Sequence, residues 1–418
     1  MSESQQHIPV SAARGSRRGA ILAASFIVMM IISVYQYSWF LFAYALQEEF
    51  HWSLATIGLT FTVYAYGATF VQPFSGFIAD TYGPRLVSIF ASVVVGAGLI
   101  VSSFATTPLV LYVFYGMGGL GVGILYGVST ACAVKWFPDR RGFATGLVVF
   151  GFGAGTALLN LLIQHFLETA GVQQTFFFIG IIMMVILVPL SFFYRYPDGV
   201  ETRSPAGQSR HAAGEKEFRP QDMVRTPQWF VMYFSFIVTV SVVLVFGAQM
   251  KSMAKEFNLS KGAFTALMIL FPLGNGLSRV VAGAISDIIG REKTMSIFYS
   301  LLGIAILLLV AFGDVPALFL AIVFIAALLG GSPFALYPAT VGDYYGAAYL
   351  TVNYGVTYTA KAWAGLISGW LSGYLVMQYG SYKIPLLIIA CLSLVAGVVS
   401  NPYILKAPRY RRRAVDGE

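Results

Sequence analysis

The chain has 418 residues, of which 57% are hydrophobic and 11% charged, and its mean hydropathy is +0.74. A soluble core cannot bury that much apolar surface, so these values exclude an ordinary soluble protein and indicate a polytopic membrane protein. Cys132 and Cys391 are the two cysteines, and both fall in apolar stretches. They therefore indicate neither a disulfide framework nor a metal cluster.

Hydropathy predicts an all-α fold with twelve membrane-spanning helices. The first follows Arg17 and Arg18 and is too long for a cleavable signal peptide. The predicted spans are residues 19–46, 54–79, 86–105, 109–134, 143–168, 175–195, 228–250, 262–287, 294–312, 315–340, 349–377 and 384–405. A polar break rich in Glu, Arg, Pro and Gly divides six spans from six. We expect a tail over 1–18, six-helix bundles over 19–195 and 228–405, a linker over 196–227 and a basic tail over 406–418.

The distribution of Lys and Arg predicts how the chain lies in the bilayer. With the N-terminus inside, 20 of the 26 Lys and Arg fall in cytoplasmic segments, 4 fall outside and 2 lie within spans. Positive charge collects on the cytoplasmic side, so both termini and the linker are expected there, in a cell inner (cytoplasmic) membrane. This asymmetry accounts for the net charge of +8. The lipid bilayer is therefore the expected partner, and nucleic acid is not.

An internal repeat links the two halves. Gly76, Asp80 and Gly83 close the second span, and Gly283, Asp287 and Gly290 close the eighth, each residue 207 positions after its counterpart. A repeat at half the chain length predicts two equivalent bundles related by an axis along the membrane normal.

The first of these motifs resembles the signature loop of the major facilitator superfamily. Residues 34–39 in span 1 and 136–146 entering span 5 are similar to the monocarboxylate transporter and oxalate–formate antiporter family, and the likeness covers about residues 19–405. Within this family, the chain resembles a bacterial monocarboxylate (lactate) transporter. The resemblance implies the major facilitator fold, alternating access and function as a monomer, and we expect no cofactor.

Two cations lie within spans, and they indicate what is transported. All 18 Asp and Glu fall in loops, tails or span ends, so Arg279 and Lys361 lack an anionic partner at their depth. A charge at the bilayer centre costs at least ~2.5–3.5 kcal/mol. A substrate carboxylate between the two would compensate it, with Asn275 on the same helix face as Arg279. The alternative is that both cations face water or carbonyls and serve only helix packing.

The opposite wall of the site is expected from polar and aromatic residues. Subtracting 207 from Arg279 and Lys361 gives Gln72 and Ala154, so the cations belong to the second half alone. The first half should instead offer side chains with an apolar body and a polar tip. The candidates are Gln36, Tyr37, Tyr126 and Phe152. The two tyrosines match pocket residues of the family, although plain packing is the alternative for any single aromatic residue.

Departures from the family pattern bear on the substrate and on proton coupling. Phe334 stands where the antiporter has tyrosine, and Tyr358 replaces a tryptophan, which leaves room for a monocarboxylate methyl group. Asn275 stands where animal carriers have aspartate, so the usual proton-carrying carboxylate is missing. Burial disfavours a charged amine and an anion favours it, so Lys361 is the first candidate to carry the proton. His165, near the end of span 5, is a weaker one.

The loop motifs are expected to control rocking of the two bundles. By analogy with the family, Asp80 and Asp287 pair with arginine and cap a neighbouring helix. The alternative for the basic residues is that they only obey the positive-inside pattern. The residues predicted for this role are Gly76, Asp80, Gly83, Arg85, Asp139, Arg140, Arg141, Asp287, Gly290 and Arg291.

The sequence therefore predicts a secondary active transporter for a small organic anion of the lactate and pyruvate class, moved together with a proton. An anion exchanger of the oxalate–formate type is the alternative. A membrane enzyme would need a catalytic His, Cys or carboxylate cluster within the spans, which the sequence does not place there. A channel or receptor is disfavoured by the 207-residue repeat and its closing loops.

Overall fold

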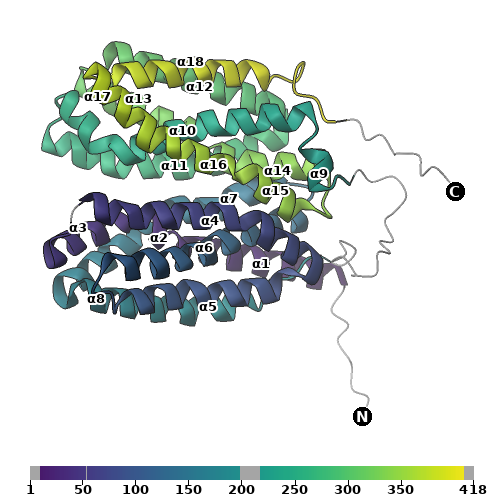
Figure 1. Ribbon diagram of the computed structural model, residues 1–418. Helices are drawn as coiled ribbons and strands as arrows, with labels where there is room; N and C mark the ends of the chain where they lie inside the picture. Colours follow the sequence, from purple (N-terminus) through teal and green to yellow (C-terminus); the bar gives the residue numbers. More distant parts are fainter. Residues whose placement is uncertain (1–9, 53, 198–216, 409–418) are drawn as a thin grey trace.

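The computed structural model describes residues 10–52, 54–197 and 217–408, and every regular element in these ranges is a helix. Figure 1 shows two layers of long helices, one built from the first half of the chain and one from the second. The first layer comprises α1 (Val10–Ile32), α2 (Val34–Tyr37), α3 (Trp39–Phe50), α4 (Leu54–Tyr82), α5 (Pro84–Ser102), α6 (Pro108–Trp136), α7 (Arg141–Ala154) and α8 (Thr156–Ser191).

The second layer repeats this arrangement. It comprises α9 (Pro220–Met223), α10 (Pro227–Glu256), α11 (Lys261–Ile289), α12 (Arg291–Phe312), α13 (Pro316–Gly330), α14 (Pro333–Tyr345), α15 (Leu350–Tyr358), α16 (Ala360–Leu366), the π-helix η1 (Ile367–Leu371), α17 (Ser372–Tyr379) and α18 (Lys383–Val399). Several of these helices begin with proline, whose fixed φ suits the first turn and whose missing N–H would have no partner there. The predicted all-α fold of two helical bundles is confirmed.

Eight of the described helical runs are long and apolar enough to cross a membrane. They lie within 17–43, 84–102, 108–136, 162–191, 227–247, 261–289, 291–312 and 316–345, and α7 and α18 are shorter apolar helices. The α8 helix bends sharply at Gly171, whose φ of 76° is a conformation that glycine adopts readily. It therefore supplies the end of predicted span 5 and most of span 6. Each predicted span coincides with one of these helices or with a run of shorter ones.

Four of the predicted spans are interrupted rather than continuous. Span 1 breaks at Ser33 and Ser38, span 5 at Gly155, span 10 at Gly331–Ser332 and span 11 at Thr359. At three breaks a hydroxyl satisfies a freed carbonyl within hydrogen-bond distance: Ser33 to Met30, Ser332 to Leu329 and Thr359 to Val356. Backbone of this kind is tolerated at membrane depth only where protein or a cavity surrounds it. The breaks therefore mark the interior of the molecule.

Contact between the bundles is made by glycine-bearing faces. α7 packs along α11, and α4 packs along α15. A Cβ atom at Gly146 would collide with the carbonyl of Arg279, and one at Gly142 with the carbonyl of Gly283. Small residues of this type let two membrane helices approach closely. We call the end of the molecule where α9 lies the α9 end, and the other the opposite end (Figure 1).

Most of the predicted linker, 196–227, and of the predicted tail 406–418 lies outside the described residues. Half of the predicted tail 1–18 does so as well, but residues 10–18 are helical and belong to α1, which begins earlier than the predicted first span. The part of the linker that is described joins the second bundle: the Phe218 N–H donates to the Tyr345 carbonyl at 2.9 Å, and the Phe218 carbonyl accepts from Asn353. Glu217 accepts the backbone N–H groups of Ala347 and Ala348 just before α15. These contacts anchor residues 217–218 at the α9 end.

Candidate anion-binding site between the bundles

Arg279 occupies the centre of the site. It lies on α11, only 1% of its side chain is exposed, and its guanidinium reaches across to the first bundle. Nη1 donates to the carbonyl of Val149 on α7 at 2.6 Å, and Nη2 donates to the Asn275 Oδ1 at 2.9 Å and to the Tyr37 hydroxyl at 3.4 Å. All three acceptors are neutral. Among the described residues, no carboxylate pairs with this buried charge.

Several buried polar groups around the guanidinium have no hydrogen-bond partner in the described chain. They are Arg279 Nε, Asn275 Nδ2, Ser278 Oγ and the Tyr126 hydroxyl. Native interiors satisfy almost all such groups, and a cluster of exceptions at one place calls for a ligand or water. Because Asn275 Oδ1 already accepts from Arg279, its amide presents a donor. The group as a whole offers mostly donors, which suits an anion.

Lys361 is the second cation of the site. It lies on α16, just beyond the break at Thr359, and is half-buried. Its Nζ donates to Gln36 Oε1 of the first bundle at 2.9 Å and to the Tyr358 hydroxyl at 3.2 Å. The bond to Gln36 crosses between bundles, as the bond from Arg279 to Tyr37 does. Both cations therefore hold the two bundles together at this level, and no carboxylate in the described part of the chain pairs with either of them.

Aromatic rings enclose the space beside the cations. Phe152 stands edge-on to Tyr37 and Tyr126, with ring centroids 5.5 and 5.2 Å apart, and Tyr126 lies 5.1 Å from Tyr358. The guanidinium carbon of Arg279 lies 4.8 Å above the ring of Phe334. A cation over an aromatic face gains stabilisation that does not neutralise its charge. The structure thus brings together the nine residues predicted to bind substrate.

One predicted residue is not part of this group. His165 is exposed on α8, where its ring lies against Phe166 with centroids 6.3 Å apart. Its carbonyl accepts from Thr169, as an ordinary helical carbonyl can. No contact joins it to Arg279 or Lys361 among the described residues, so its geometry gives no support for a role in proton coupling.

The α9 end is closed by carboxylates that cross between the bundles. Asp80, at the end of α4, accepts from Lys135 Nζ at 2.7 Å within its own bundle. It also accepts from the Thr351 hydroxyl at 2.6 Å and the Val352 N–H at 3.0 Å, at the start of α15. A carboxylate at a helix N-terminus satisfies free N–H groups and favours the helix dipole. The expectation that Asp80 pairs with arginine is wrong, because lysine holds that position.

The second motif repeats this arrangement from the other side. Asp287 accepts the N–H groups of Gly142 and Phe143, at the start of α7, at 3.0 and 2.8 Å. It also pairs with Arg291 at 2.5 Å. Each aspartate thus caps an interface helix of the opposite bundle. Gly83 and Gly290, with φ of 92° and 98°, end the two helices that carry them.

The remaining loop residues behave in two ways. Arg141 Nη1 lies 2.7 Å from Asp343 of the second bundle, which also pairs with Arg291 at 2.8 Å. Asp139 instead pairs with Arg18 of its own bundle. Although desolvation acts to raise it, the hydrogen bond and charge of Arg18 hold the pKa of Asp139 below its ordinary value. Arg85 and Arg140 are exposed, and Gly76 faces the Thr351 backbone, where a Cβ would lie 2.7 Å from the carbonyl oxygen.

Sequence reasoning missed some contributors to the site. The Val149 carbonyl holds Arg279, and a backbone acceptor has no signature in residue type. Ser38 donates to Asn160 Oδ1 at 2.6 Å and so fixes the broken span that carries Gln36 and Tyr37. Asn160 is a polar residue inside an apolar predicted span, and that isolated polarity was the signal available for it.

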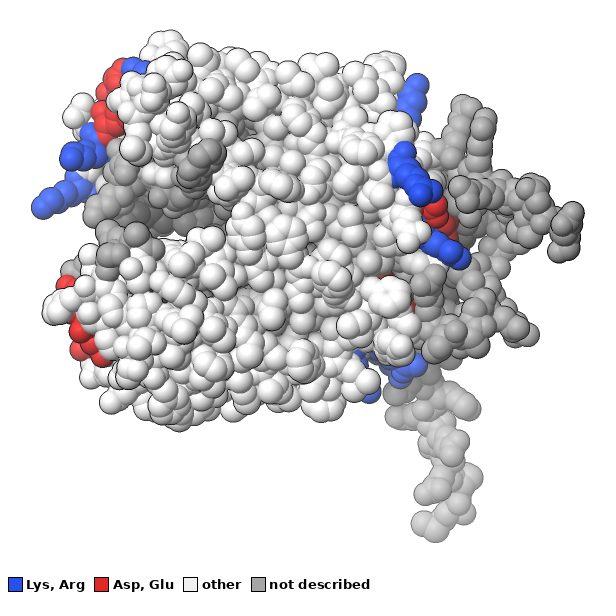
Figure 2. Space-filling model, in the orientation of Figure 1, with Lys and Arg blue, Asp and Glu red and all other residues white. Residues whose placement is uncertain are grey.

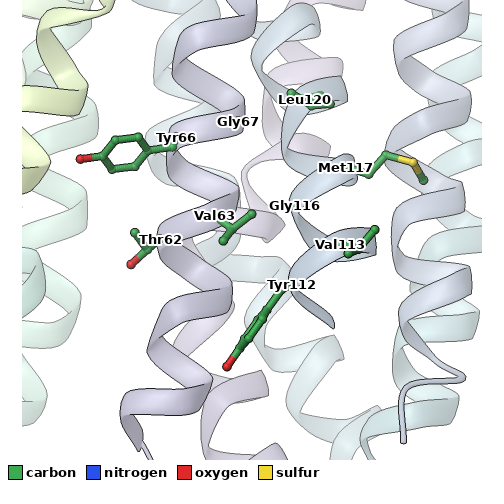
Figure 3. A pocket seen from close by; sticks show the side chains of 9 residues that line it. All are labelled: Thr62, Val63, Tyr66, Gly67, Tyr112, Val113, Gly116, Met117 and Leu120. Carbon is green, nitrogen blue, oxygen red and sulfur yellow. The ribbon is translucent and has the colours of Figure 1, made fainter. Parts of the chain in front are cut away.

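A separate groove of 690 Å³ lies between α4 and α6. Figure 3 shows Val63 and Gly67 on one helix facing Gly116 on the other, with the ring of Tyr66 pointing away. None of the predicted site residues lines it, and its lining contains no charged residue. It does not fit an anion, and the site around Arg279 remains the candidate.

Comparisons with known proteins agree with this architecture. The sequence matches the family model of the Major Facilitator Superfamily over residues 21–250 and 242–418. It is 32% identical over 397 residues to the oxalate:formate antiporter of Oxalobacter formigenes, which covers 94% of this chain and 93% of that protein. Over 117 residues, 28% of this chain and 23% of the relative, it is 33% identical to monocarboxylate transporter 9 of Gallus gallus.

A solved structure extends the comparison to the fold. The human organic anion transporter MFSD10 (TETRAN) superposes with a TM-score of 0.71 at 12% identity, covering 92% of this chain and 99% of that one. At such low identity this likeness concerns the fold alone. Together with the match along nearly the whole sequence, it confirms the expected family, whose members are non-enzymatic. The chain belongs to the Major Facilitator Superfamily and is an integral membrane transporter.

Proposed function

We propose that this transporter moves small monocarboxylates of the lactate and pyruvate class across the cytoplasmic membrane, together with a proton, by alternating access. One observation carries the proposal: the buried guanidinium of Arg279 touches neutral acceptors alone among the described residues, and its Nε has no partner there. A carboxylate at this position would neutralise the charge and accept from the free donors.

The surroundings of the two cations support a carboxylate at Arg279. The Nε of Arg279 is a free donor, whereas Gln36 and Tyr358 take two of the three N–H groups of Lys361 and leave one. The rings of Phe334 and Phe152 present apolar surface next to Arg279, which suits the carbon chain of an organic acid. The site is complete within one chain, and we propose that a monomer transports.

Lys361 is the proposed proton carrier. Burial beside Arg279 disfavours its ammonium form, and an arriving anion favours it. Anion and proton would then bind together and cross as a neutral pair. We also propose that the α9 end is cytoplasmic, because the basic loop residues gather there, including Arg85, Arg140, Arg141 and Arg291.

Exchange of anions is the second candidate, and the likeness to the Oxalobacter formigenes antiporter favours it. An exchanger would use the same cations, but its binding site would turn back to face the first side of the membrane only when a second anion is bound. One carboxylate of oxalate would then accept from Arg279 and the other from the remaining N–H group of Lys361.

Uptake into proteoliposomes tests the proposal and separates the two candidates. We expect labelled lactate and pyruvate to enter vesicles without internal substrate when the outside is more acidic. A symporter needs only that pH gradient, whereas an exchanger needs formate or oxalate inside. Uptake of oxalate alone, dependent on internal formate, would replace the first candidate with the second. Failure of all four acids under both conditions would exclude both.

A further inference from the structure

Two segments at the opposite end from α9 share the pair Glu-Phe at equivalent positions. Residues 48–51, at the end of α3, read Glu-Glu-Phe-His, and residues 255–258, at the end of α10, read Lys-Glu-Phe-Asn. The offset is again 207 residues. His51 and Asn258 have φ of 55° and 52° and are the two non-glycine residues with positive φ in the described chain. The two turns thus share an uncommon backbone conformation as well as the Glu-Phe pair.

The second residue of each segment performs the same task. Glu49 accepts from the N–H of Val172 at 3.2 Å, directly after the bend in α8. Glu256 accepts from the N–H of Tyr382 at 3.0 Å, at the start of α18. Each glutamate therefore connects the first membrane span of its bundle to the last span of the same bundle. Since these bonds lie within bundles, the two turns are fixed parts of two rigid bodies.

The first residue of each segment differs in charge. Glu48 and Lys255 are both exposed, and neither forms an ion pair with a described residue. Figure 2 shows acidic atoms at this end of the lower bundle and both basic and acidic atoms on the upper bundle, with a hollow between the two bundles. An exact repeat would place like charges at both positions. This one position has opposite signs on the two rims.

We propose that Glu48 and Lys255 form an ion pair across this mouth when the bundles close at the opposite end. The pair rests on the alternating access of the proposed function. At the α9 end, Asp80 and Asp287 already cross between the bundles from positions related by the same repeat. Rocking about the level of Arg279 would part those contacts and bring the far ends together. Rims related by a two-fold axis approach each other there, and opposite charges attract where two glutamates would repel.

Distances across the mouth test the pair without relying on transport. Gly58 and Thr265 are exposed, 207 residues apart, and lie near the starts of α4 and α11. Spin labels on Gly58→Cys and Thr265→Cys, with the exposed Cys391 replaced by serine, report the separation by pulsed electron resonance. With Glu48 and Lys255 unchanged, we expect two distances between the labels: a long one when the opposite end is open and a short one when it is closed. Because exposed pairs are weak, E48K or K255E should lower the short-to-long ratio by about two- to five-fold.

The double charge reversal E48K/K255E should restore the ratio, and 1 M salt should shrink the differences between variants. A matched control combines E168K with K255E, which preserves net charge but misplaces it, and should leave the ratio low. Single reversals without effect, or a double reversal no nearer to wild type than the singles, would overturn the pair.

The same labels separate this inference from the substrate assignment. If the wild type never shows the short distance with lactate, formate or oxalate supplied, alternating access is wrong and the pair with it. If the distances follow the expected pattern while vesicles take up none of these acids, the pair stands and the substrate assignment fails.

Discussion

The guanidinium of Arg279 uses much of its donor capacity on the protein itself. Of its five N–H groups, those on the two terminal nitrogens reach Val149, Asn275 and Tyr37, while Nε is unused. These bonds hold the plane of the group but leave its charge uncompensated. The arginine is therefore held in place in advance for the carboxylate that we propose it binds, which would reduce the ordering cost of binding.

Arg279→Lys tests whether geometry matters in addition to charge. Lysine keeps the cation but cannot reach three acceptors and a carboxylate with one ammonium. Hydrogen bonds to charged groups contribute about 1.5–3 kcal/mol each, so loss of one to substrate should raise the half-saturating concentration roughly ten- to hundredfold. Initial uptake rates at a series of lactate concentrations measure this half-saturating concentration. Arg85→Lys, at an exposed loop position, is the control, and equal affinity in both variants would remove Arg279 from the site.

Lys361→Gln tests the proposed proton carrier. Glutamine can still bond to Gln36 and Tyr358 but cannot take up a proton. We expect accumulation driven by a pH gradient to fall at least tenfold, whereas exchange of labelled for unlabelled lactate at equal pH continues. Vesicle uptake with an internal pH dye measures both anion and proton. If the variant still accumulates lactate with protons at the wild-type level, Lys361 is not the proton carrier and another group must have that role.

Residue type predicted the two cations because charge inside a span is rare and costly, and the resemblance to the family pointed to their aromatic neighbours. The same reasoning could not find the acceptors. A carbonyl such as that of Val149 becomes available only through the course of the backbone. The choice of lysine over arginine as the partner of Asp80 likewise depends on which helix lies beside it, and both cation types are present in the neighbouring loop.

At the scale of helices, the interruptions matter more than the helices themselves. Residues of the site stand next to breaks: Tyr37 beside Ser38, Phe334 beside Ser332, and Lys361 beside Thr359. Hydropathy averages over about 19 residues, so a break of one or two residues does not change it, and continuous spans were predicted. The number and order of spans follow from that average. The breaks follow from local hydroxyl–carbonyl bonds that only the folded chain defines.

The α7–α11 contact should tolerate no added methyl group. A Cβ at Gly146 would collide with the Arg279 carbonyl, which is backbone and cannot move aside. We expect Gly146→Ala to hold the bundles apart at the α9 end and to reduce uptake several-fold; overpacking of this kind costs about 1–3 kcal/mol. Gly365→Ala is the matched control, because nothing lies within 4 Å of the added atom. Similar uptake by the two variants would show that this contact is not needed.

For the whole molecule, the two ends differ in how they are joined. At the α9 end, charged and backbone groups from both bundles interlock, whereas the opposite end shows a hollow between its rims (Figure 2). The sequence repeat predicted two equivalent bundles, but not which end would be closed, since each end has its own charged residues and residue type does not tell which set of contacts is the more stable. The free-energy balance between them depends on contacts such as those of Asp287.

Asp287→Asn should shift that balance toward opening of the α9 end. The carboxylate accepts from two N–H groups of α7 and pairs with Arg291, and an amide keeps the shape while losing the charge. Charge-assisted bonds contribute about 1.5–3 kcal/mol, so even partial loss should raise the share of molecules closed at the opposite end roughly tenfold.

Labels at positions 58 and 265 would record this shift as a gain of the short distance. Asp139→Asn is the matched control, because Asp139 pairs with Arg18 inside one bundle and its loss leaves contacts between bundles intact. If both variants keep the wild-type distances, the crossing aspartate does not set the balance. If only Asp287→Asn gains the short distance, bonds that cross between the bundles, rather than loop charge in general, decide which end of the transporter is open.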